Sequence, residues 1–402
     1  MINKSKRLDN VKYEIRGKVL EEAEKLEAKG VNILKLNIGN PGVFNFSAPK
    51  RILKHMKKKL KYNQGYSNSK GLLKERLAIK KYYKEKNIDI DINNIYIGNG
   101  VSELILISMQ ALLNKNDEIL VPMPNYPLWS AAINLNEGKS VFYKCDEDNN
   151  WYPDIEDIKR KITDKTKGIV IINPNNPTGA LYPKYILKEI IEIAKKRNLI
   201  IFSDEIYDRL LYDNLVHTSI ASLSKDVPII TYSGLSKSHM IAGFRAGWMC
   251  LSGNTKYFNN YIEGLNLLTS MRLCSNVPAQ SIITKCLNDK KNTKKYFNKK
   301  GRLYKQREYV YNRLINIPGI SATKPNAAFY MFPKIDNKKY NIKNDEEFIL
   351  EFLKEKKVLL VQGTGFNYNK NDHFRITYLA NIKELKYALD ALEAFLKKRS
   401  KT

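Results

Sequence analysis

The chain has 402 residues, of which 43% are hydrophobic and 10% aromatic, enough for one large globular domain and a smaller one. No stretch reaches the roughly 18 consecutive apolar residues of a membrane-spanning helix, and the basic N-terminus is not followed by an apolar run of the signal-peptide type. We therefore expect a soluble cytoplasmic protein.

A net charge of +28 is the extreme feature of the composition, and it raises a nucleic-acid hypothesis because basic surfaces attract phosphates. The basic clusters at 54–61, 290–300 and 397–401 contain no interleaved aromatics of a recognisable nucleic-acid-binding module. A general enrichment in Lys and Asn explains the charge more simply. We favour a protein that acts on small molecules, and nucleic-acid binding is the alternative from a different class.

The cysteines and histidines are too scattered to form a zinc site. No Cys-x-x-Cys pair occurs, and no histidine cluster accompanies the thiols. We therefore expect structural thiols in a reducing compartment and no bound metal. The residues concerned are Cys145, Cys250, Cys274, Cys286, His55, His217, His239 and His373.

The first part of the chain is predicted to be an arm followed by two helices. Apolar spacing predicts a helix over 9–26, a short strand over 33–38 and a turn at 39–41. Helical patterning returns at 49–60 and 71–86, and the loop 63–70 separates these two segments.

The middle of the chain alternates short apolar runs with amphipathic segments, which is typical of a mainly parallel sheet flanked by helices. Strands are predicted at 95–98, 118–121, 168–173, 199–204, 229–232 and 246–251, and helices at 102–113, 126–135 and 183–196. Ligands of open α/β sheets bind at the carboxyl ends of the strands, so the residues there are the first candidates for a site.

After about Asp289 the pattern changes. A long lysine-rich helical region is predicted to run to Leu314, followed by β-like runs at 327–333, 358–362 and 373–377 and a closing helix to Lys398. This arrangement suits a smaller α+β domain. We divide the chain into an N-terminal arm with part of the small domain (1–48), a large domain (49–288) and a C-terminal small domain (289–402).

A phosphate site is one interpretation of Gly98-Asn-Gly-Val-Ser102, which follows a strand and opens a helix. Backbone N–H groups and the helix dipole favour an anion there. Glu103 stands where a dinucleotide fingerprint needs Gly or Ala, so a monophosphate fits better. An ordinary N-capped helix explains the motif equally well.

Two further strand ends carry polar side chains. The turn Asn173-Pro-Asn-Asn176-Pro-Thr-Gly179 can hold an amide still, although turn chemistry alone also explains it. Asp204 ends a strongly apolar strand, where an unpaired charge is costly, so it needs a cationic partner. That partner is either a ligand cation or, as is common, a local ion pair or helix cap.

Two basic residues stand in unusual surroundings. Lys237, in Tyr232-Ser-Gly-Leu-Ser-Lys237, lies in a segment too apolar and too glycine-rich for a surface helix, and we infer that it is used chemically. Arg375 interrupts an apolar strand near the C-terminus, and a guanidinium there can grip a carboxylate with two parallel hydrogen bonds. A surface-facing arginine is the commoner outcome of such a pattern.

Taken together, these motifs and their order resemble the fold-type I pyridoxal-phosphate aminotransferases, from about Asn10 to the C-terminus. More narrowly, 36–41, 99–105, 270–280 and 358–364 resemble the bacterial alanine (glutamate-pyruvate) aminotransferase branch. The resemblance implies an α/β fold, in which a mainly parallel seven-stranded sheet flanked by helices is joined to a smaller α+β domain. It also implies pyridoxal 5'-phosphate as cofactor and a homodimer.

The resemblance also implies roles for the residues singled out above. Lys237 would bind the cofactor covalently and, once displaced by substrate, move a proton from the substrate Cα. This transfer needs a neutral amine, which a desolvated site beside another cation favours. Arg245 would be that cation and would bind the cofactor phosphate, while Asp204 would keep the pyridine nitrogen protonated.

Other matching positions complete the implied site. The implied cofactor contacts are the backbone of Gly100, Val101 and Ser102, together with Ser236, Tyr126 stacked on the ring, Asn176 and Tyr207 at its phenolic oxygen, and Tyr66 reaching the phosphate across a dimer interface. The implied substrate contacts are Gly39, Asn176 and Arg375, with Arg375 taking the α-carboxylate.

The chain departs at four places from the pattern of the branch or of related aminotransferases, which leaves the implied cofactor unchanged but bears on the choice of substrate. The chain has Ala327-Ala328 in place of Gly-Ala, Gly42-Val43 in place of Ala-Pro, Met240 in place of a basic residue and Gly234 in place of a serine. We expect transfer of the amino group of alanine to 2-oxoglutarate by a ping-pong cycle. An aromatic or branched-chain amino donor is the alternative within the class.

Overall fold

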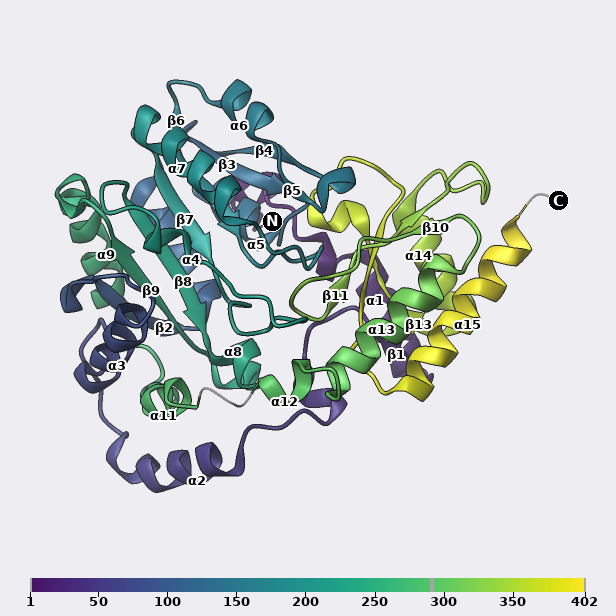
Figure 1. Ribbon diagram of the computed structural model, residues 1–402, viewed down its shortest axis with the longest axis horizontal. Coiled ribbons are helices and arrows are strands. Elements are labelled where there is room, and N and C mark those ends of the chain that lie inside the picture. The colour runs from purple at the N-terminus through teal and green to yellow at the C-terminus, as the bar shows by residue number, and fades with distance from the viewer. Residues whose placement is uncertain (1, 290–292, 401–402) are drawn as a thin grey trace.

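An eight-stranded sheet forms the centre of the computed structural model, which describes residues 2–289 and 293–400 (Figure 1). The strand order is β2-β9-β8-β7-β6-β3-β4-β5. The strands are β2 (Ile95–Asn99), β3 (Glu118–Met123), β4 (Lys139–Asp146), β5 (Tyr152–Pro153), β6 (Thr166–Ile172), β7 (Ile200–Asp204), β8 (Ile229–Gly234) and β9 (Ala246–Ser252).

Five neighbouring strands, β8-β7-β6-β3-β4, are parallel, so their carboxyl ends meet at one edge of the sheet. β9 is antiparallel to both β2 and β8, and β5 is antiparallel to β4. The mainly parallel sheet is confirmed, with one strand more than the seven expected. All six strands predicted from apolar runs are present. β4 was missed because Lys139 and Lys144 are exposed and interrupt its apolar pattern.

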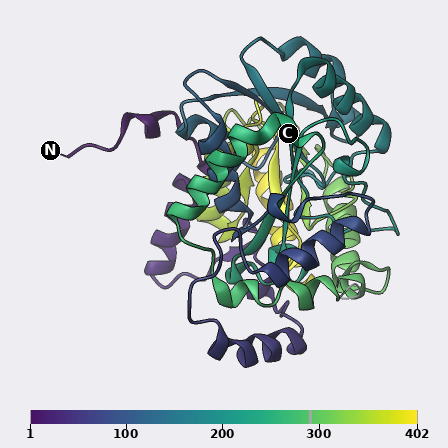
Figure 2. The same ribbon diagram turned by 90° about the vertical axis from the view of Figure 1, so that its left-hand side faces the viewer.

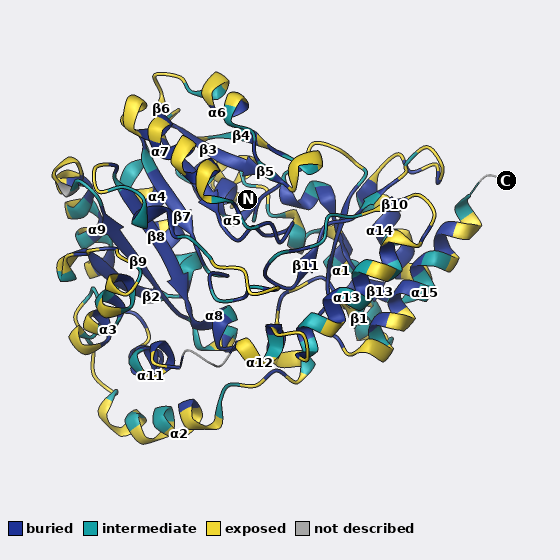
Figure 3. Cartoon of the chain, viewed as in Figure 1, coloured by how far each residue is buried: buried dark blue, intermediate teal, exposed yellow. Residues whose placement is uncertain are grey.

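Helices cover both faces of this sheet, so successive residues of a central strand enter different cores. In β6, Ile169 and Ile171 pack toward α3, α7 and α11, whereas Val170 and Ile172 pack toward α4, α5 and α9. Figure 3 shows the resulting buried strands between helices with exposed outer surfaces. The helices are α3 (Leu73–Lys84), α4 (Val101–Leu112), α5 (Leu128–Leu135), α6 (Ile155–Lys161), α7 (Lys184–Arg197), α8 (Leu235–Ser238), α9 (Asn259–Met271), α10 (Val277–Gln280) and α11 (Ile283–Leu287).

A second core joins the N-terminal segment to the C-terminal part of the chain. Leu36 and Phe46 pack in one cluster with residues from Phe297 to Leu396, and β1 pairs in parallel with β13. The elements here are α1 (Lys18–Ala28), β1 (Leu34–Lys35), α12 (Lys294–Phe297), α13 (Arg302–Ile315), β10 (Ile320–Ser321), β11 (Tyr330–Met331), β12 (Lys334–Ile335), α14 (Asp345–Lys356), β13 (Val358–Leu359), β14 (Val361–Gln362), β15 (Phe374–Thr377) and α15 (Ile382–Arg399). This is the expected α+β arrangement.

Several helix predictions need correction. The helix expected over 9–26 begins only at Lys18, after two short 3-10 turns and Gly17, and Figure 2 shows the N-terminal segment projecting from the body. α5 begins at Leu128 rather than at residue 126, directly after Pro127. α2 (Lys50–Lys59) matches its prediction closely.

The lysine-rich helix predicted from Asp289 to Leu314 is also wrong as one element. Residues 290–292 lie outside the described residues, and the rest forms α12 and α13 with a break at 298–301. Gly301 packs against the backbone of α12, because a Cβ there would lie 2.4 Å from the carbonyl oxygen of Tyr296. This close approach separates the two helices.

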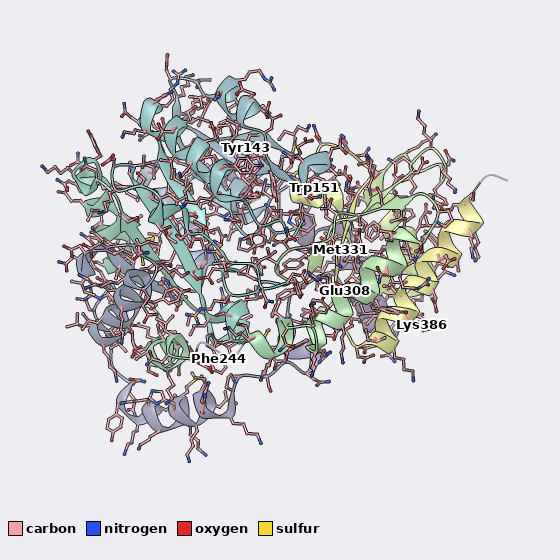
Figure 4. All side chains as sticks on the ribbon, in the orientation of Figure 1. Tyr143, Trp151, Phe244, Glu308, Met331 and Lys386 are labelled. Atoms are coloured by element: carbon pink, nitrogen blue, oxygen red, sulfur yellow. The ribbon has the colours of Figure 1, made fainter. Side chains whose placement is uncertain are left out.

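Trp151 connects the large sheet to the C-terminal part of the chain (Figure 4). It follows β4 and is 1% exposed. Its ring makes edge contacts with Phe332, Tyr368 and His373, at centroid distances of 5.4 to 5.7 Å. Such aromatic contacts add to the gain from burying a large apolar surface.

The helices of the described ranges include none that is both long and apolar enough to cross a membrane. The longest, α15, has 18 residues and carries charged residues throughout its length.

The start of α15 provides a test of local stability. Asn381 accepts a hydrogen bond from the backbone of Glu384, and the Glu384 carboxylate accepts one from the backbone of Asn381, each at 3.0 Å. Replacing Asn381 by Ala should lower the free energy of unfolding by about 1 kcal/mol, measured by urea denaturation. The exposed Asn149→Ala control should change it by less than about 0.5 kcal/mol. Equal effects of the two substitutions would contradict the capping role.

Candidate active site

A cavity of about 600 Å³ opens at the carboxyl ends of the parallel strands, between the sheet and the C-terminal part. Its volume suits a small-molecule ligand. The predicted site residues that line it are Gly39, Val101, Ser102, Tyr126, Asn176, Asp204, Tyr207, Ser236, Lys237, Arg245 and Arg375. Residues that lie far apart in the sequence, from Gly39 to Arg375, therefore meet in one place.

Asp204 ends β7 and is 4% exposed. Its carboxylate accepts hydrogen bonds from the indole N–H of Trp129 at 3.2 Å and from the backbone of Ile206 at 3.3 Å. Within the described residues Asp204 forms no ion pair, so the local partner considered from the sequence is not found there. Burial raises the pKa of Asp204 to about 6, against the effect of these two hydrogen bonds.

Lys237 lies in α8, which directly follows β8, and its side chain enters the cavity. Its Nζ donates a hydrogen bond to the carbonyl oxygen of Gly39 at 2.7 Å and lies 5.9 Å from the centre of the Phe329 ring. Gly39 leaves no room for a side chain, because a Cβ there would lie 2.0 Å from the Tyr330 hydroxyl. The backbone at Gly39 is therefore packed between Lys237 and Tyr330.

The N-terminus of α4 faces the same cavity through Val101 and Ser102. Gly100 precedes the helix with φ of +81°, and a Cβ there would lie 2.3 Å from a guanidinium nitrogen of Arg245. Arg245 also donates to the carbonyl oxygens of Ala242 at 2.9 Å and Asn99 at 3.2 Å. A helix N-terminus beside a fixed arginine is a favourable place for a phosphate.

Arg375 is 3% exposed, and the alternative of a surface-facing arginine is wrong. Its guanidinium donates to the side-chain oxygen of Asn176 at 2.8 Å and to the carbonyl oxygen of Asn37. The rings of Tyr330 and Phe366 each lie 4.5 Å from the guanidinium carbon. One guanidinium nitrogen, Nε, has no hydrogen-bond partner within residues 2–289 and 293–400, so a buried donor remains for an anionic ligand.

Two tyrosine pairs form the walls of the cavity. The hydroxyls of Tyr207 and Tyr330 are 2.9 Å apart, and so are those of Tyr13 and Tyr126. Tyr13 comes from the N-terminal arm, so this arm also reaches the site. These hydroxyls place neutral donors and acceptors around the centre of the cavity.

Two predicted site residues do not line this cavity. Gly100 lies behind the start of α4, in contact with Arg245. Tyr66 lies in the loop between α2 and α3 and is 82% exposed, so it makes no contact with the cavity of its own chain.

Sequence reasoning missed Tyr13, Asn37, Trp129 and Tyr330 as site residues. Asn37, Trp129 and Tyr330 stand inside segments that were already singled out, 36–41, 126–135 and 327–333, so their neighbours were a usable signal. Tyr13 had no such signal, because only the folded chain brings the arm to the sheet edge.

Within residues 2–289 and 293–400, no group of three or more His, Cys, Asp or Glu side chains is placed to hold a metal ion. All four cysteines are unpaired thiols, and three of them are buried.

Residues 31–392 match the family Aminotransferase class I and II, and the chain belongs to this family. Enzymes of this class and fold use pyridoxal phosphate, which is the cofactor of this protein. The buried carboxylate, the lysine and the cradle formed by α4 and Arg245 fit that group, since each can meet one of its polar parts.

The chain is similar over its whole length to proteins of known name. It is 53% identical over 396 residues to glutamate-pyruvate aminotransferase AlaA of Escherichia coli K12, covering 98% of each chain. A crystal structure of an aminotransferase from Escherichia coli superposes with a TM-score of 0.98 at 52% identity, covering 100% of each chain. The alanine aminotransferase of Pyrococcus furiosus superposes with a TM-score of 0.94 at 42% identity, covering 99% of this chain and 100% of that one.

The raised pKa of Asp204 has a consequence for the apoprotein. The ordinary carboxyl value is 3.8 and the folded value is about 6, so between these pH values the native state binds a proton that the unfolded state releases. The free energy of unfolding must then fall as pH rises through this window. Replacing Asp204 by Asn removes this loss, and above pH 6 the variant should be more stable than the wild type by about 2 to 4 kcal/mol.

Urea denaturation of the two apoproteins from pH 4 to 8 measures this difference. Glu205, whose pKa burial raises to about 7, contributes the same pH dependence to both proteins, so their difference isolates Asp204. The exposed Asp226→Asn control should follow the wild type. Parallel curves for wild type and Asp204→Asn would show that Asp204 titrates normally.

Proposed function

We propose that this aminotransferase transfers the amino group of alanine to 2-oxoglutarate, giving pyruvate and glutamate in a ping-pong cycle. The observation that carries the proposal is 53% identity, over 98% of both chains, to a protein named glutamate-pyruvate aminotransferase. The name alanine aminotransferase of the Pyrococcus furiosus structure supports it as well. Both substrates carry an α-carboxylate, which the buried Arg375 can bind in each half-reaction.

Pyridoxal phosphate, when bound, supplies a ring that withdraws electrons from the substrate Cα. Asp204 would pair with the pyridine nitrogen and keep it protonated. This role is supported by its burial, which leaves the carboxylate in need of a cation, and by the absence of an ion pair to it among the described residues. Trp129 fixes the carboxylate by donating its indole N–H.

The backbone N–H groups of Val101 and Ser102 at the start of α4, together with Arg245, would hold the phosphate. Gly100 serves by its lack of a side chain, since a Cβ there would displace the guanidinium of Arg245. Ser236, one residue before Lys237, lines the same side of the cavity and adds a hydroxyl.

Tyr126 would stack on the ring, and Asn176 and Tyr207 would hydrogen-bond to its phenolic oxygen, since all three line the cavity. Asn176 also accepts a hydrogen bond from Arg375, at 2.8 Å. It therefore links the cofactor side of the cavity to the substrate side. Gly39, whose carbonyl oxygen accepts from Lys237, completes the substrate side.

Lys237 would be the residue that holds the cofactor covalently, and its amine would act as the acid and base that moves a proton at the substrate Cα. The position of its amine supports this role, because Nζ lies inside the cavity and its hydrogen-bond partner is a neutral carbonyl rather than a carboxylate. The amine is therefore free to exchange a proton with the substrate.

The larger assembly is part of the same proposal. We divide the chain into an arm with part of the small domain (1–48), a large domain (49–288) and a small domain (289–402), supported by the shared core of the first and last parts. The functional unit is a homodimer in which Tyr66 reaches the phosphate of the partner subunit, supported by its 82% exposure. A cytoplasmic location is supported by four unpaired thiols.

A comparison of amino donors tests the substrate. With 2-oxoglutarate as acceptor, alanine should give a higher kcat/KM than leucine or tyrosine, because pocket shape discriminates by about 1 to 3 kcal/mol for each methylene. Initial rates at several concentrations of each donor provide the values. A preference for tyrosine or leucine over alanine would replace alanine as the donor while leaving the aminotransferase class intact.

The role of Lys237 is tested by replacing it with Ala. Turnover of alanine should fall by at least about 10² to 10⁴, the range typical of a general acid or base. The exposed Lys256→Ala variant serves as control and should keep wild-type turnover. Near-normal activity of Lys237→Ala would refute the assignment.

A further inference from the structure

The segment Ser270–Gln280 contributes no residue to the cavity lining. Its polar groups nevertheless contact the loop that carries Tyr66 and the start of α4. Gln280 accepts a hydrogen bond from the backbone of Leu72 at 2.7 Å and donates to the hydroxyl of Ser67 at 3.2 Å. Both partners belong to the stretch that carries Tyr66. The segment therefore holds this stretch in place.

Arg272 connects the start of α4 to the loop that carries Tyr66. Its guanidinium forms an ion pair with Glu103, in the first turn of α4. A second guanidinium nitrogen donates to the carbonyl oxygens of Ser69, at 3.2 Å, and Ile97, at 2.9 Å. The side chain of Arg272 is 15% exposed and that of Glu103 is 25% exposed, so water weakens these contacts only in part.

Glu103 is linked through Asn99 to Arg245, the cation of the proposed phosphate site. Its two carboxylate oxygens accept from the backbone N–H of Asn99, at 2.8 Å, and from the side-chain amide of Asn99, at 2.9 Å. The carbonyl oxygen of Asn99 in turn accepts from Arg245 at 3.2 Å. Asn276 fixes the remaining polar atom of Asn99 by donating its backbone N–H at 2.8 Å.

We propose that Arg272 is a positioning residue that joins the phosphate cradle to the loop of Tyr66. It holds Glu103 against Asn99, which sets the carbonyl that orients Arg245, and it holds the Tyr66 loop through Ser69. The inference rests on the proposed binding of the cofactor phosphate by α4 and Arg245. It adds that the grip on the phosphate depends on a residue that touches neither cofactor nor substrate.

Binding of two cofactor forms to apoprotein tests the first half of the proposal. In Arg272→Gln, the Kd for pyridoxal phosphate should rise about tenfold, since charge-assisted hydrogen bonds to the cradle are lost. The Kd for pyridoxal, which lacks the phosphate, should change by less than about twofold. Fluorescence titration of the apoprotein measures both constants.

Two further variants make the outcome decisive. Glu103→Gln breaks the same ion pair from the other side, should give the same phosphate-selective loss, and replaces Arg272→Gln if that variant does not fold. Arg313→Gln breaks an ion pair with Asp390 on the outer helices and should change neither constant. An unchanged Kd for pyridoxal phosphate, or an equal loss for both forms, overturns the proposal; wild-type apoprotein that binds neither form contradicts the proposed function instead.

A double-mutant cycle tests the connection to the loop. Tyr66→Phe removes the hydroxyl that reaches the phosphate of the partner subunit, and Arg272→Gln removes the support of the loop. If both act through the same loop, the combined rise in the Kd for pyridoxal phosphate should be smaller than the product of the two single rises. A combined rise equal to that product overturns the connection between Arg272 and Tyr66.

Discussion

The hydrogen bond from Arg375 to Asn176, 2.8 Å long, is the contact on which the site depends. It joins the C-terminal strand β15 to the turn after β6, and the same guanidinium reaches the carbonyl oxygen of Asn37 in the N-terminal segment. A buried arginine without such acceptors would be costly. The three segments are thereby held together at the mouth of the sheet, and the cavity exists because they meet there.

The sheet supplies the other half of the site through the direction of its strands. Five parallel strands end at one edge, so Asp204 at the end of β7 and Lys237 after β8 both reach the cavity although they are far apart in the sequence. The cost of burying Asp204, seen in its raised pKa, is the kind of local destabilisation that functional sites carry and that the rest of the fold must offset. A bound cation would remove it.

Sequence reasoning succeeded where one physical signal dominates. The uninterrupted apolar runs of β6 and β7 predict buried parallel strands, and Asp204, Lys237 and Arg375 attract notice because a charge stands in an apolar setting. It failed where contacts between distant residues determine a helix boundary or a site residue. The break before α13 depends on the approach of Gly301 to Tyr296. The pairing of Tyr13 with Tyr126 spans 113 positions and leaves no local pattern.

The visible absorption spectrum of the purified protein tests the central claim, that these converging residues bind pyridoxal phosphate and present it to alanine. The account predicts a yellow protein whose absorbance shifts when alanine is added and returns when 2-oxoglutarate follows. A colourless protein that added pyridoxal phosphate does not reconstitute, or a yellow one whose spectrum alanine leaves unchanged, would contradict it.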